Sequence, residues 1–358
     1  MAYPPFRHEV IVERTPGEEN DVCLLADLTG NGWLDVIIGG KFGENNLCWY
    51  EAPHWTPHII GQAYLEAGGV LLDINGNGRL DLVVGEAWGG QSGRPGGGTE
   101  LYWFEQPQDP RMPWPKHVIE NGFHRYHSQA VGDVDDDGEP EILIASQEAG
   151  IVAYYDIPAD LTGARWPLEC RHIIYDTLSL EGLAIGDVNG DGRNEVIAGT
   201  NIFFRPDDPY ARWKRKPVAD FRWPVVSLGD LNGDGLPELV AAEGESFPAR
   251  LAWFDLHREE MHLLADDLFH PHSLALADFT GNGALDIMVG EMGLGQWQNP
   301  RLYIYVNDGR GHFQPVLISE GIPTHMAAVG DVNGDGKPDI VGKPYKPGTW
   351  VDVWWNTW

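Results

Sequence analysis

Short apolar segments recur along the chain, and each is followed by the same kind of polar loop. Residues 130–132 and 327–330 are apolar runs before such a loop, and residues 81–85 form a β-branched run after one. Short apolar runs bounded by turn residues are typical of β-strands. The pattern therefore predicts a strand, a polar loop and a second strand in each repeat.

The polar loops share the pattern Asp-x-(Asp/Asn/Thr)-x-(Asp/Asn)-Gly-x-x-(Asp/Glu). The pattern occurs seven times at intervals of 43 to 60 residues, starting at Asp27, Asp73, Asp133, Asp187, Asp230, Asp278 and Asp331. A third segment with paired aromatic residues, such as Trp103-Phe104, and a fourth apolar segment follow in the repeats. Seven repeats of four strands predict an all-β protein, a seven-bladed β-propeller of four-stranded antiparallel blades, with residues 1–358 as a single domain.

The two ends of the chain are expected to close this ring together. The last repeat ends near Trp355, at its third strand, and residues 8–12 form a spare strand of the fourth type ahead of the first repeat. A closed ring of blades avoids an open sheet edge. We therefore expect the N-terminal strand to complete the last blade.

The seven loops also have the spacing of a calcium site. Oxygen-bearing side chains alternate along each loop, and the glycine at the sixth position permits a left-handed turn. Calcium takes six to eight oxygen ligands, and an EF-hand is excluded because the residues after each loop are strand-like and its final glutamate is missing. We expect several structural Ca²⁺ ions. The third, fourth, fifth and seventh loops carry most carboxylates, with candidate ligands Asp133, Asp135, Asp137, Glu141, Asp187, Asn189, Asp191, Glu195, Asp230, Asn232, Asp234, Glu238, Asp331, Asn333, Asp335 and Asp339.

The other three loops carry fewer carboxylates. Their candidate ligands are Asp27, Asn31, Asp35, Asp73, Asn75, Asn77, Asp81, Asp278, Asn282 and Asp286. Amide and hydroxyl hydrogen bonds could close these loops without metal, and the alternative for all seven is a plain Asx-type turn.

Loops such as residues 186–192 and 330–336 resemble the FG-GAP or VCBS repeat of integrin-type propellers, and the resemblance covers essentially the whole chain. It implies calcium on one face of the ring and ligand on the other. The architecture is similar, more loosely, to propeller polysaccharide lyases and to the propeller part of aldos-2-ulose dehydratase. Those enzymes eliminate across a sugar carbon.

Histidines, carboxylates and aromatic residues gather in the segments expected at the face opposite the acidic loops. The candidate catalytic residues are His127, His272, Tyr126, His124, Glu181, His325, Arg125 and Lys343. The candidate substrate-binding residues are Glu66, Glu86, Trp88, Glu148, Trp223, Glu243, His270 and Glu291. In this hypothesis His127 or His272 is the base, Tyr126 is the acid, and Arg125 or Lys343 steadies negative charge. The alternative is a Zn²⁺ or other divalent metal on the axis, held by the histidines with Glu66 or Glu181.

These segments differ from repeat to repeat, which favours one asymmetric site over the repeated pockets of a multivalent lectin. We expect a carbohydrate-active lyase or dehydratase that acts by β-elimination on an acidic or keto sugar at the axial pocket. The alternative is a non-catalytic propeller that binds a glycan or a protein.

Composition narrows the partners. Lysine and arginine total 24 against 54 acidic residues, and the net charge of −30 would repel nucleic acid. No apolar stretch is long enough for membrane insertion, and the three cysteines, Cys23, Cys48 and Cys170, are expected to be buried thiols that act as small hydrophobic residues. No secretory signal is visible, so we expect a cytoplasmic protein, or a secreted or periplasmic one if a leader has been removed.

Overall fold

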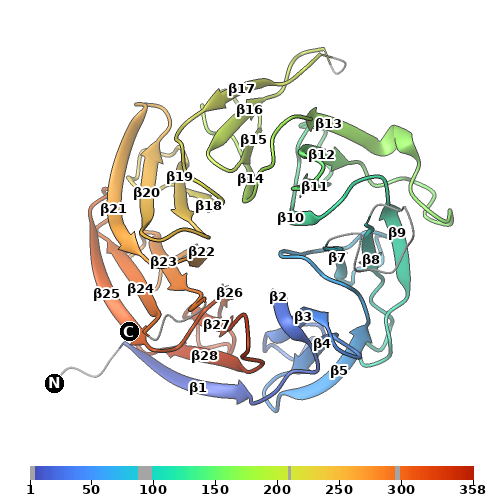
Figure 1. Ribbon diagram of the computed structural model, residues 1–358, viewed down its shortest axis with the longest axis horizontal. Helices are drawn as coiled ribbons and strands as arrows, with labels where there is room; N and C mark the ends of the chain where they lie inside the picture. Colours follow the sequence, from blue (N-terminus) through green and yellow to red (C-terminus); the bar gives the residue numbers. More distant parts are fainter. Residues whose placement is uncertain (1–4, 88–98, 209–210, 295–298) are drawn as a thin grey trace.

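The computed structural model describes residues 5–87, 99–208, 211–294 and 299–358, and these form seven four-stranded antiparallel sheets around a central axis (Figure 1). The predicted all-β fold and the seven-bladed propeller are confirmed. The one short 3₁₀ helix among the described residues is η1 (Leu168–Cys170).

Each blade runs from an innermost strand at the axis to an outermost strand at the rim. The innermost strands are β2 (Glu18–Ala26), β6 (Val70–Leu72), β10 (Tyr126–Gly132), β14 (Leu183–Gly186), β18 (Pro224–Gly229), β22 (Pro271–Ala277) and β26 (Met326–Gly330). The second strands are β3 (Asp35–Phe42), β7 (Asp81–Gly85), β11 (Glu141–Ser146), β15 (Glu195–Ala198), β19 (Glu238–Glu243), β23 (Asp286–Glu291) and β27 (Asp339–Lys343). The third strands are β4 (Leu47–Glu51), β8 (Leu101–Phe104), β12 (Ile151–Tyr155), β16 (Asn201–Phe204), β20 (Ala249–Asp255), β24 (Arg301–Asn307) and β28 (Val351–Asn356). The outermost strands are β5 (Thr56–Gly61), β9 (Lys116–Glu120), β13 (Arg171–Tyr175), β17 (Lys214–Pro217), β21 (Glu260–Leu268), β25 (Phe313–Glu320) and β1 (Phe6–Val12).

The last of these outermost strands comes from the other end of the chain. β1 pairs antiparallel with β28, with Phe6 opposite Asn356 and Val10 opposite Asp352. The side chains add to this pairing, because His8 Nε2 lies 2.7 Å from the buried carboxylate of Asp352. The predicted closure of the ring by the N-terminal strand is confirmed.

The core lies between neighbouring blades. One cluster packs Trp103 of β8 against Tyr126 of β10 and Tyr155 of β12, so aromatic residues of the second and third blades meet at their seam. The second strands are covered on both faces, and all six residues of β11 are buried. Strands with two covered faces read as continuous apolar runs, which explains the sequence pattern.

Strand pairing fixes which residues share a face of the ring. In the third blade Gly132 pairs with Glu141 beside the acidic loop, and Tyr126 pairs with Ser146 at the other end of the same two strands. The same arrangement holds in the sixth blade, where Pro271 pairs with Glu291 and Ala277 with Asp286. The entrances to the innermost strands therefore lie on the face opposite the acidic loops, which we call the upper face.

The described residues contain no helix that is long and apolar enough to cross a membrane. Cys23 and Cys48 are buried free thiols, as predicted, whereas the free thiol Cys170 is only partly buried.

Candidate functional site

Six of the seven blades place a charged or imidazole side chain at the entrance to the innermost strand. These side chains are at most 6% exposed, and they are Asp21, Glu66, His127, Glu181, His272 and His325. The fifth blade breaks the series, because Val225 follows the first residue of β18 where His127 and His272 follow the first residues of β10 and β22. We call these six residues the axial ring.

A shared backbone deformation aims three of these side chains. Asp21, His127 and His272 each lie at a register shift at the start of the innermost strand, where the ladder skips them. Two residues earlier the backbone is left-handed, with φ of 49° at Glu19, 57° at Arg125 and 45° at His270. Bulges redirect side chains near active sites, and left-handed non-glycine residues persist only where the surrounding structure holds them.

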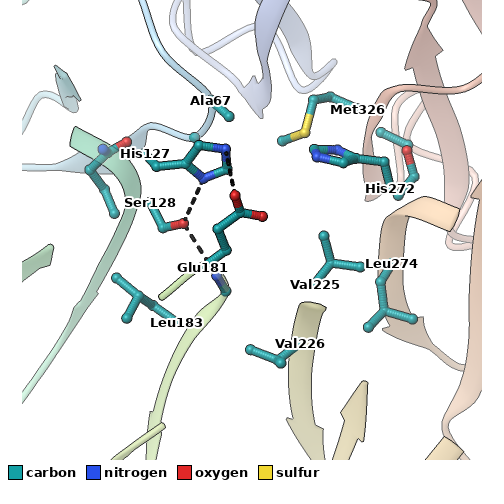
Figure 2. Close-up of a pocket in the computed structure, with 15 residues that line it drawn as sticks. Ala67, His127, Ser128, Glu181, Leu183, Val225, Val226, His272, Leu274 and Met326 are labelled. Atoms are coloured by element: carbon teal, nitrogen blue, oxygen red, sulfur yellow. Dashed lines mark hydrogen bonds and ion pairs between the residues drawn. The ribbon is translucent and has the colours of Figure 1, made fainter. Parts of the chain in front are cut away.

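His127 lies between two carboxyl groups. Its Nε2 is 3.5 Å from Glu181 Oε1 (Figure 2). The same nitrogen is 4.0 Å from Glu66 Oε1. Its Nδ1 is 3.3 Å from Ser128 Oγ, which also accepts the backbone N–H of Gly182. These contacts fix the ring with Nε2 directed toward the axis.

Burial sets the protonation states of this group. It lowers the pKa of His127 well below its usual value, and the nearby Arg125 adds to the effect. It raises the pKa of Glu181 to about 8, helped by the charge of Glu245, while Arg125 and the hydrogen bond from Gln147 oppose the rise. At neutral pH the 3.5 Å contact therefore joins a neutral imidazole to a protonated carboxyl group, and it is not an ion pair.

Two more histidines lie across the axis. The rings of His272 and His325 stack with centroids 4.4 Å apart, and His272 Nδ1 donates to the backbone oxygen of His325 at 3.1 Å. Lys343 is fully buried with Nζ 2.9 Å from His325 Nδ1, and burial lowers the pKa of this lysine to about 8. Because Nδ1 of His272 carries the hydrogen donated to the backbone oxygen of His325, Nε2 of His272 is left as an acceptor.

The two remaining carboxylates of the axial ring are bound to cations. Lys41 Nζ lies 2.8 Å from Asp21 Oδ2 and 3.3 Å from Glu66 Oε1, and Arg125 Nε lies 3.2 Å from Glu66 Oε2. Glu181 has the amide of Gln147 in that place. Glu181 thus differs from its neighbours in the ring by lacking a direct cation contact among the described residues.

A cavity of about 180 Å³ lies on the axis at this level. Its polar wall is formed by His127, Ser128, Glu181, His272 and Ser273, and its apolar wall by Leu183, Val225, Val226, Leu274 and Met326 (Figure 2). We call this cavity the axial pocket. It is smaller than typical ligand pockets of about 300–1,000 Å³, so it suits one small unit of a ligand.

Several predicted site residues lie elsewhere. Tyr126 is fully buried in the core between the second and third blades, where its hydroxyl accepts the backbone N–H of Phe123. Tyr126 therefore points into the core between blades, whereas His127 lines the axial pocket. His124 precedes the strand and does not line the pocket, and its backbone oxygen accepts the hydroxyl of Ser146.

The predicted substrate-binding glutamates mostly hold the upper links together. Glu243 and Glu291 accept bonds from Arg250 and Arg301 of the adjoining third strands. Glu86 accepts the backbone N–H of Glu100, and the exposed Glu148 does not line the axial pocket. The structure also leaves Trp223 and His270 outside the axial pocket, and Trp88 lies outside the described residues.

The predicted zinc ligands are not brought together into a metal site. Within the described ranges, the groups of three ligand atoms within 4.8 Å of one another are Asp133, Asp135 and Glu141, and Asp234, Glu238 and Asp255. Neither group contains an axial histidine. An axial metal stays a prediction.

The acidic loops share a frame of hydrogen bonds. The first aspartate of each accepts loop N–H groups, as Asp133 does from Asp137 and Gly138 at 3.1 Å. Gly138 has a left-handed φ of 92°, which explains the glycine of the pattern.

The ninth residue divides the loops into two types. Where it is aspartate, both oxygens accept backbone N–H groups, as Asp286 does from Phe279 at 3.0 Å and from Asn307 at 2.8 Å. Where it is glutamate, one oxygen accepts a backbone N–H and the other turns into the loop, as Glu195 Oε1 does toward Asn189. Aspartate-type loops start at Asp27, Asp73, Asp278 and Asp331, and glutamate-type loops at Asp133, Asp187 and Asp230.

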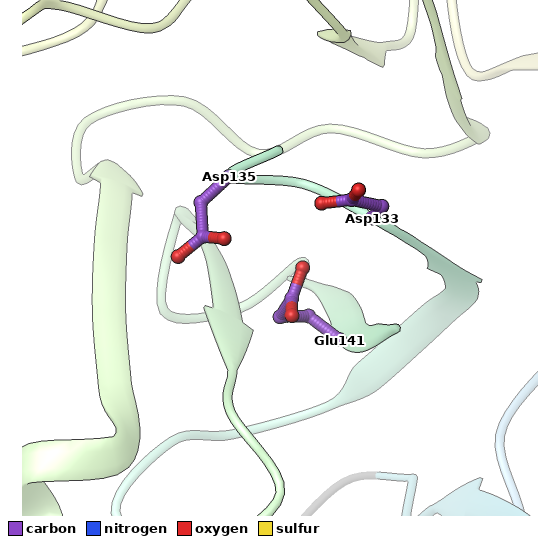
Figure 3. A group of neighbouring side chains, drawn as sticks. All are labelled: Asp133, Asp135 and Glu141. Carbon is purple, nitrogen blue, oxygen red and sulfur yellow. The ribbon is translucent and has the colours of Figure 1, made fainter. Parts of the chain in front are cut away.

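The two groups of closely spaced carboxylates each contain the glutamate of a glutamate-type loop, and Asp255 of β20 completes the second group. Figure 3 shows the first group. The donors of both groups are hard oxygens, which fit calcium. The seventh loop has three carboxylates but closes like the first, second and sixth, because Asp339 accepts from Val332 and Asn356.

Comparisons with known proteins agree with this architecture. A family model described as an FG-GAP-like repeat matches residues 27–84 and 278–342. No curated protein sequence matches the chain. Crystal structures of BBS1N in complex with ARL6DN, soaked with mercury or with lead, are similar at TM-scores of 0.62 and 0.57, with 10% and 11% identity, and cover 98% of this chain and 96% of theirs.

The V. cholerae biofilm matrix protein Bap1 is similar at a TM-score of 0.45 and 10% identity, over 94% of this chain and 76% of that one. At such identities the likeness concerns the fold alone. The ring of sheets shows that this chain is a seven-bladed β-propeller, and two of its segments, residues 27–84 and 278–342, match the FG-GAP-like repeat.

Proposed function

We propose that the protein is a carbohydrate-active enzyme that catalyses β-elimination on an acidic or keto sugar in the axial pocket. The observation that carries the proposal is the contact between the neutral imidazole of His127 and the protonated carboxyl group of Glu181, 3.5 Å apart at the pocket wall. Such a reaction requires a base that is unprotonated and an acid that is protonated at neutral pH.

In the proposed step, His127 Nε2 takes the proton from the carbon next to the sugar's carboxylate or ketone. The electrons of that C–H bond form the new double bond, and the C–O bond to the leaving group breaks. Glu181 gives its proton to the departing oxygen. Because the two groups lie side by side, the arrangement fits loss of both substituents from one face of the sugar.

The surroundings support this division of roles. Arg125 and Lys41 lie around Glu66 and act on His127 by favouring its neutral form. They also add positive potential where the substrate gains negative charge. Lys343 does not line the pocket and contacts Nδ1 of His325, so we assign it to orienting that ring.

Calcium belongs to this proposal in a structural role only. We infer that the third and fifth loops hold Ca²⁺, since three carboxylate oxygens lie within 4.8 Å of one another in each group, from Asp133, Asp135 and Glu141 and from Asp234, Glu238 and Asp255. In the second group Arg258 Nη1 also contacts the carboxylates of Asp234 and Asp255. Calcium there would fix the lower ends of the innermost strands, on the face opposite the axial pocket.

Turnover of acidic polysaccharides and keto sugars, followed by the ultraviolet absorbance of the unsaturated product, tests the proposal. We expect H127N and E181Q to lose turnover by about 10²-fold or more while still binding the substrate. Matched controls are H172N and E260Q, whose side chains lie on the outermost strands β13 and β21. Substrate binding without turnover by the unaltered protein would instead indicate a binding propeller.

A further inference from the structure

A second cavity begins where the axial pocket ends. It has a volume of about 300 Å³ and lies on the upper face between the fourth and fifth blades, lined by residues 178–181, 199–201, 215 and 219–224. Glu181 lines both cavities. Of the neighbouring residues Pro224 and Val225, Pro224 lines the outer cavity and Val225 lines the axial pocket. We call the outer cavity the interblade groove.

The break in the axial ring lies at the inner end of this groove. The other six blades place a charged or imidazole side chain at the entrance, whereas the fifth has Val225. β18 also pairs with β19 without a register shift, so no side chain is redirected across the axis there. The opening of the polar ring is therefore on the side of the groove, next to the acid Glu181.

One segment beside the groove is basic in a strongly acidic protein, and the charged residues that line the groove itself are Glu181, Arg215, Asp220 and Arg222. Residues 211–222 contain Arg212, Lys214, Arg215, Lys216 and Arg222 against one acidic residue, Asp220, although the whole chain has 24 basic and 54 acidic residues. The carboxylate of Asp220 is already paired with Arg250 at 3.0 Å. Positive charge is thus concentrated in the segment that forms one side of the groove.

Two of these arginines line the groove itself. Arg215 lies in β17 opposite Phe203, and its Nε donates to Asn201 Oδ1 at 2.9 Å. Arg222 is exposed, and its backbone N–H is fixed by Glu243 Oε1 at 3.2 Å. Next to it Trp223 has a left-handed φ of 47° and also lines the groove. Guanidinium groups bind carboxylates and sulfates, and an indole ring stacks on a sugar face.

We propose that the substrate is a polyanionic oligosaccharide, carrying carboxylates or sulfates, whose reacting unit enters the axial pocket while the rest of the chain follows the interblade groove over Arg222 and Arg215. This inference rests on the proposed function and specifies its substrate class. A neutral sugar would offer no negative charge to the two arginines, and a single sugar unit would leave the groove unused.

The test compares R215Q/R222Q with the unaltered protein on uronic-acid oligosaccharides of increasing length. We expect KM for a tetrasaccharide to rise about tenfold or more, and kcat to stay within about twofold, because the contacts are remote from the reacting atoms. KM for the shortest substrate should change little. The matched control is R212Q, since Arg212 belongs to the same basic segment but does not line the groove.

Binding separates this proposal from the catalytic one. In E181Q, the affinity for the tetrasaccharide should fall about tenfold or more on adding R215Q/R222Q, and it should weaken with salt. If E181Q binds in this way but the unaltered protein turns over no substrate, the proposed binding in the interblade groove is supported and the proposed β-elimination is refuted. If turnover is found but R215Q/R222Q behaves like R212Q, the groove is refuted. Competition by poly-glutamate at equal or higher affinity would also overturn the carbohydrate assignment.

Discussion

Burial decides the chemistry of individual residues at the axis. Glu66 and Glu181 are both about 2% exposed, but Lys41 and Arg125 lie against Glu66 while an amide lies against Glu181. The same low-dielectric surroundings keep His127 neutral. The adjacent groups His127 and Glu181 can thus act as base and acid, and neither role requires a bound metal.

The pH dependence of turnover follows from these states. Glu181 must hold its proton, so activity should fall as pH rises through about 8, the pKa of this group. Burial raises this pKa, Glu245 and Glu66 add to the rise, and Arg125 and Gln147 oppose it. His127 must be neutral, so no loss should occur near pH 6.5 as pH falls. The measurement is kcat/KM against pH.

Lys343 also has a pKa of about 8, so a variant must separate the two groups. K343M should keep the falling limb near pH 8 if Glu181 causes it. A limb that disappears in K343M, or a rising limb near pH 6.5, would contradict the assignment.

Tyr126 supplies a contrasting prediction at the same scale. Its hydroxyl is buried in the core with Phe123 as partner, and burial strongly raises its pKa. Y126F should lower the free energy of unfolding by about 1 kcal/mol through the lost hydrogen bond and leave kcat unchanged. A large loss of kcat at unchanged stability would restore Tyr126 as the acid.

The residues of the axial site could be predicted only in part. His127, Glu181, His272 and His325 follow from their places before the innermost strands. Their side-chain directions could not be predicted, because the bulges that point His127 inward and Tyr126 outward depend on pairing with a second strand. The interblade groove has no motif and arises only where two blades meet.

At the scale of elements, the acidic loops fall into two types according to whether the ninth residue is aspartate or glutamate, which is longer by one methylene group. Aspartate at the ninth position stays bonded on both oxygens to backbone N–H groups, whereas the longer glutamate also reaches into the loop. The loop positions and their carboxylate counts were readable from the sequence. The two closures were not, since they involve the third strand of the blade.

Calcium titration tests this division. E141Q and E238Q should each remove one tight Ca²⁺ site in calorimetry and reduce the rise in Tm that calcium gives the unaltered protein. D286N should leave the number of sites unchanged while lowering the free energy of unfolding by about 1–3 kcal/mol, because a buried acceptor is lost. Equal loss of calcium in D286N and E141Q would refute the two-type description.

At the scale of the whole molecule, the ring closes because the N-terminal strand β1 forms the outermost strand of the last blade, beside β28. The regular repeat made both the blade number and the closure predictable, since every blade carries the same turn and the terminal segments are complementary. Convergence of six blades on one asymmetric site was only partly predictable, because it joins residues from Asp21 to His325.

Removal of residues 1–12 tests the closure. The deletion should expose the edge of β28, lower Tm and promote aggregation, because an unpaired strand edge recruits other chains. V10S is the matched control, since this side chain is 45% exposed on β1. A truncated protein with unchanged Tm would show that the ring does not depend on this strand.

A crystal structure of E181Q with a bound uronic-acid oligosaccharide tests the central claim most directly. We predict one sugar unit in the axial pocket with its acidic carbon facing His127 Nε2, and the remaining units over Arg222 between the fourth and fifth blades. A sugar bound on the face of the acidic loops, or an axial pocket closed to sugar while the chain binds elsewhere, would contradict the account.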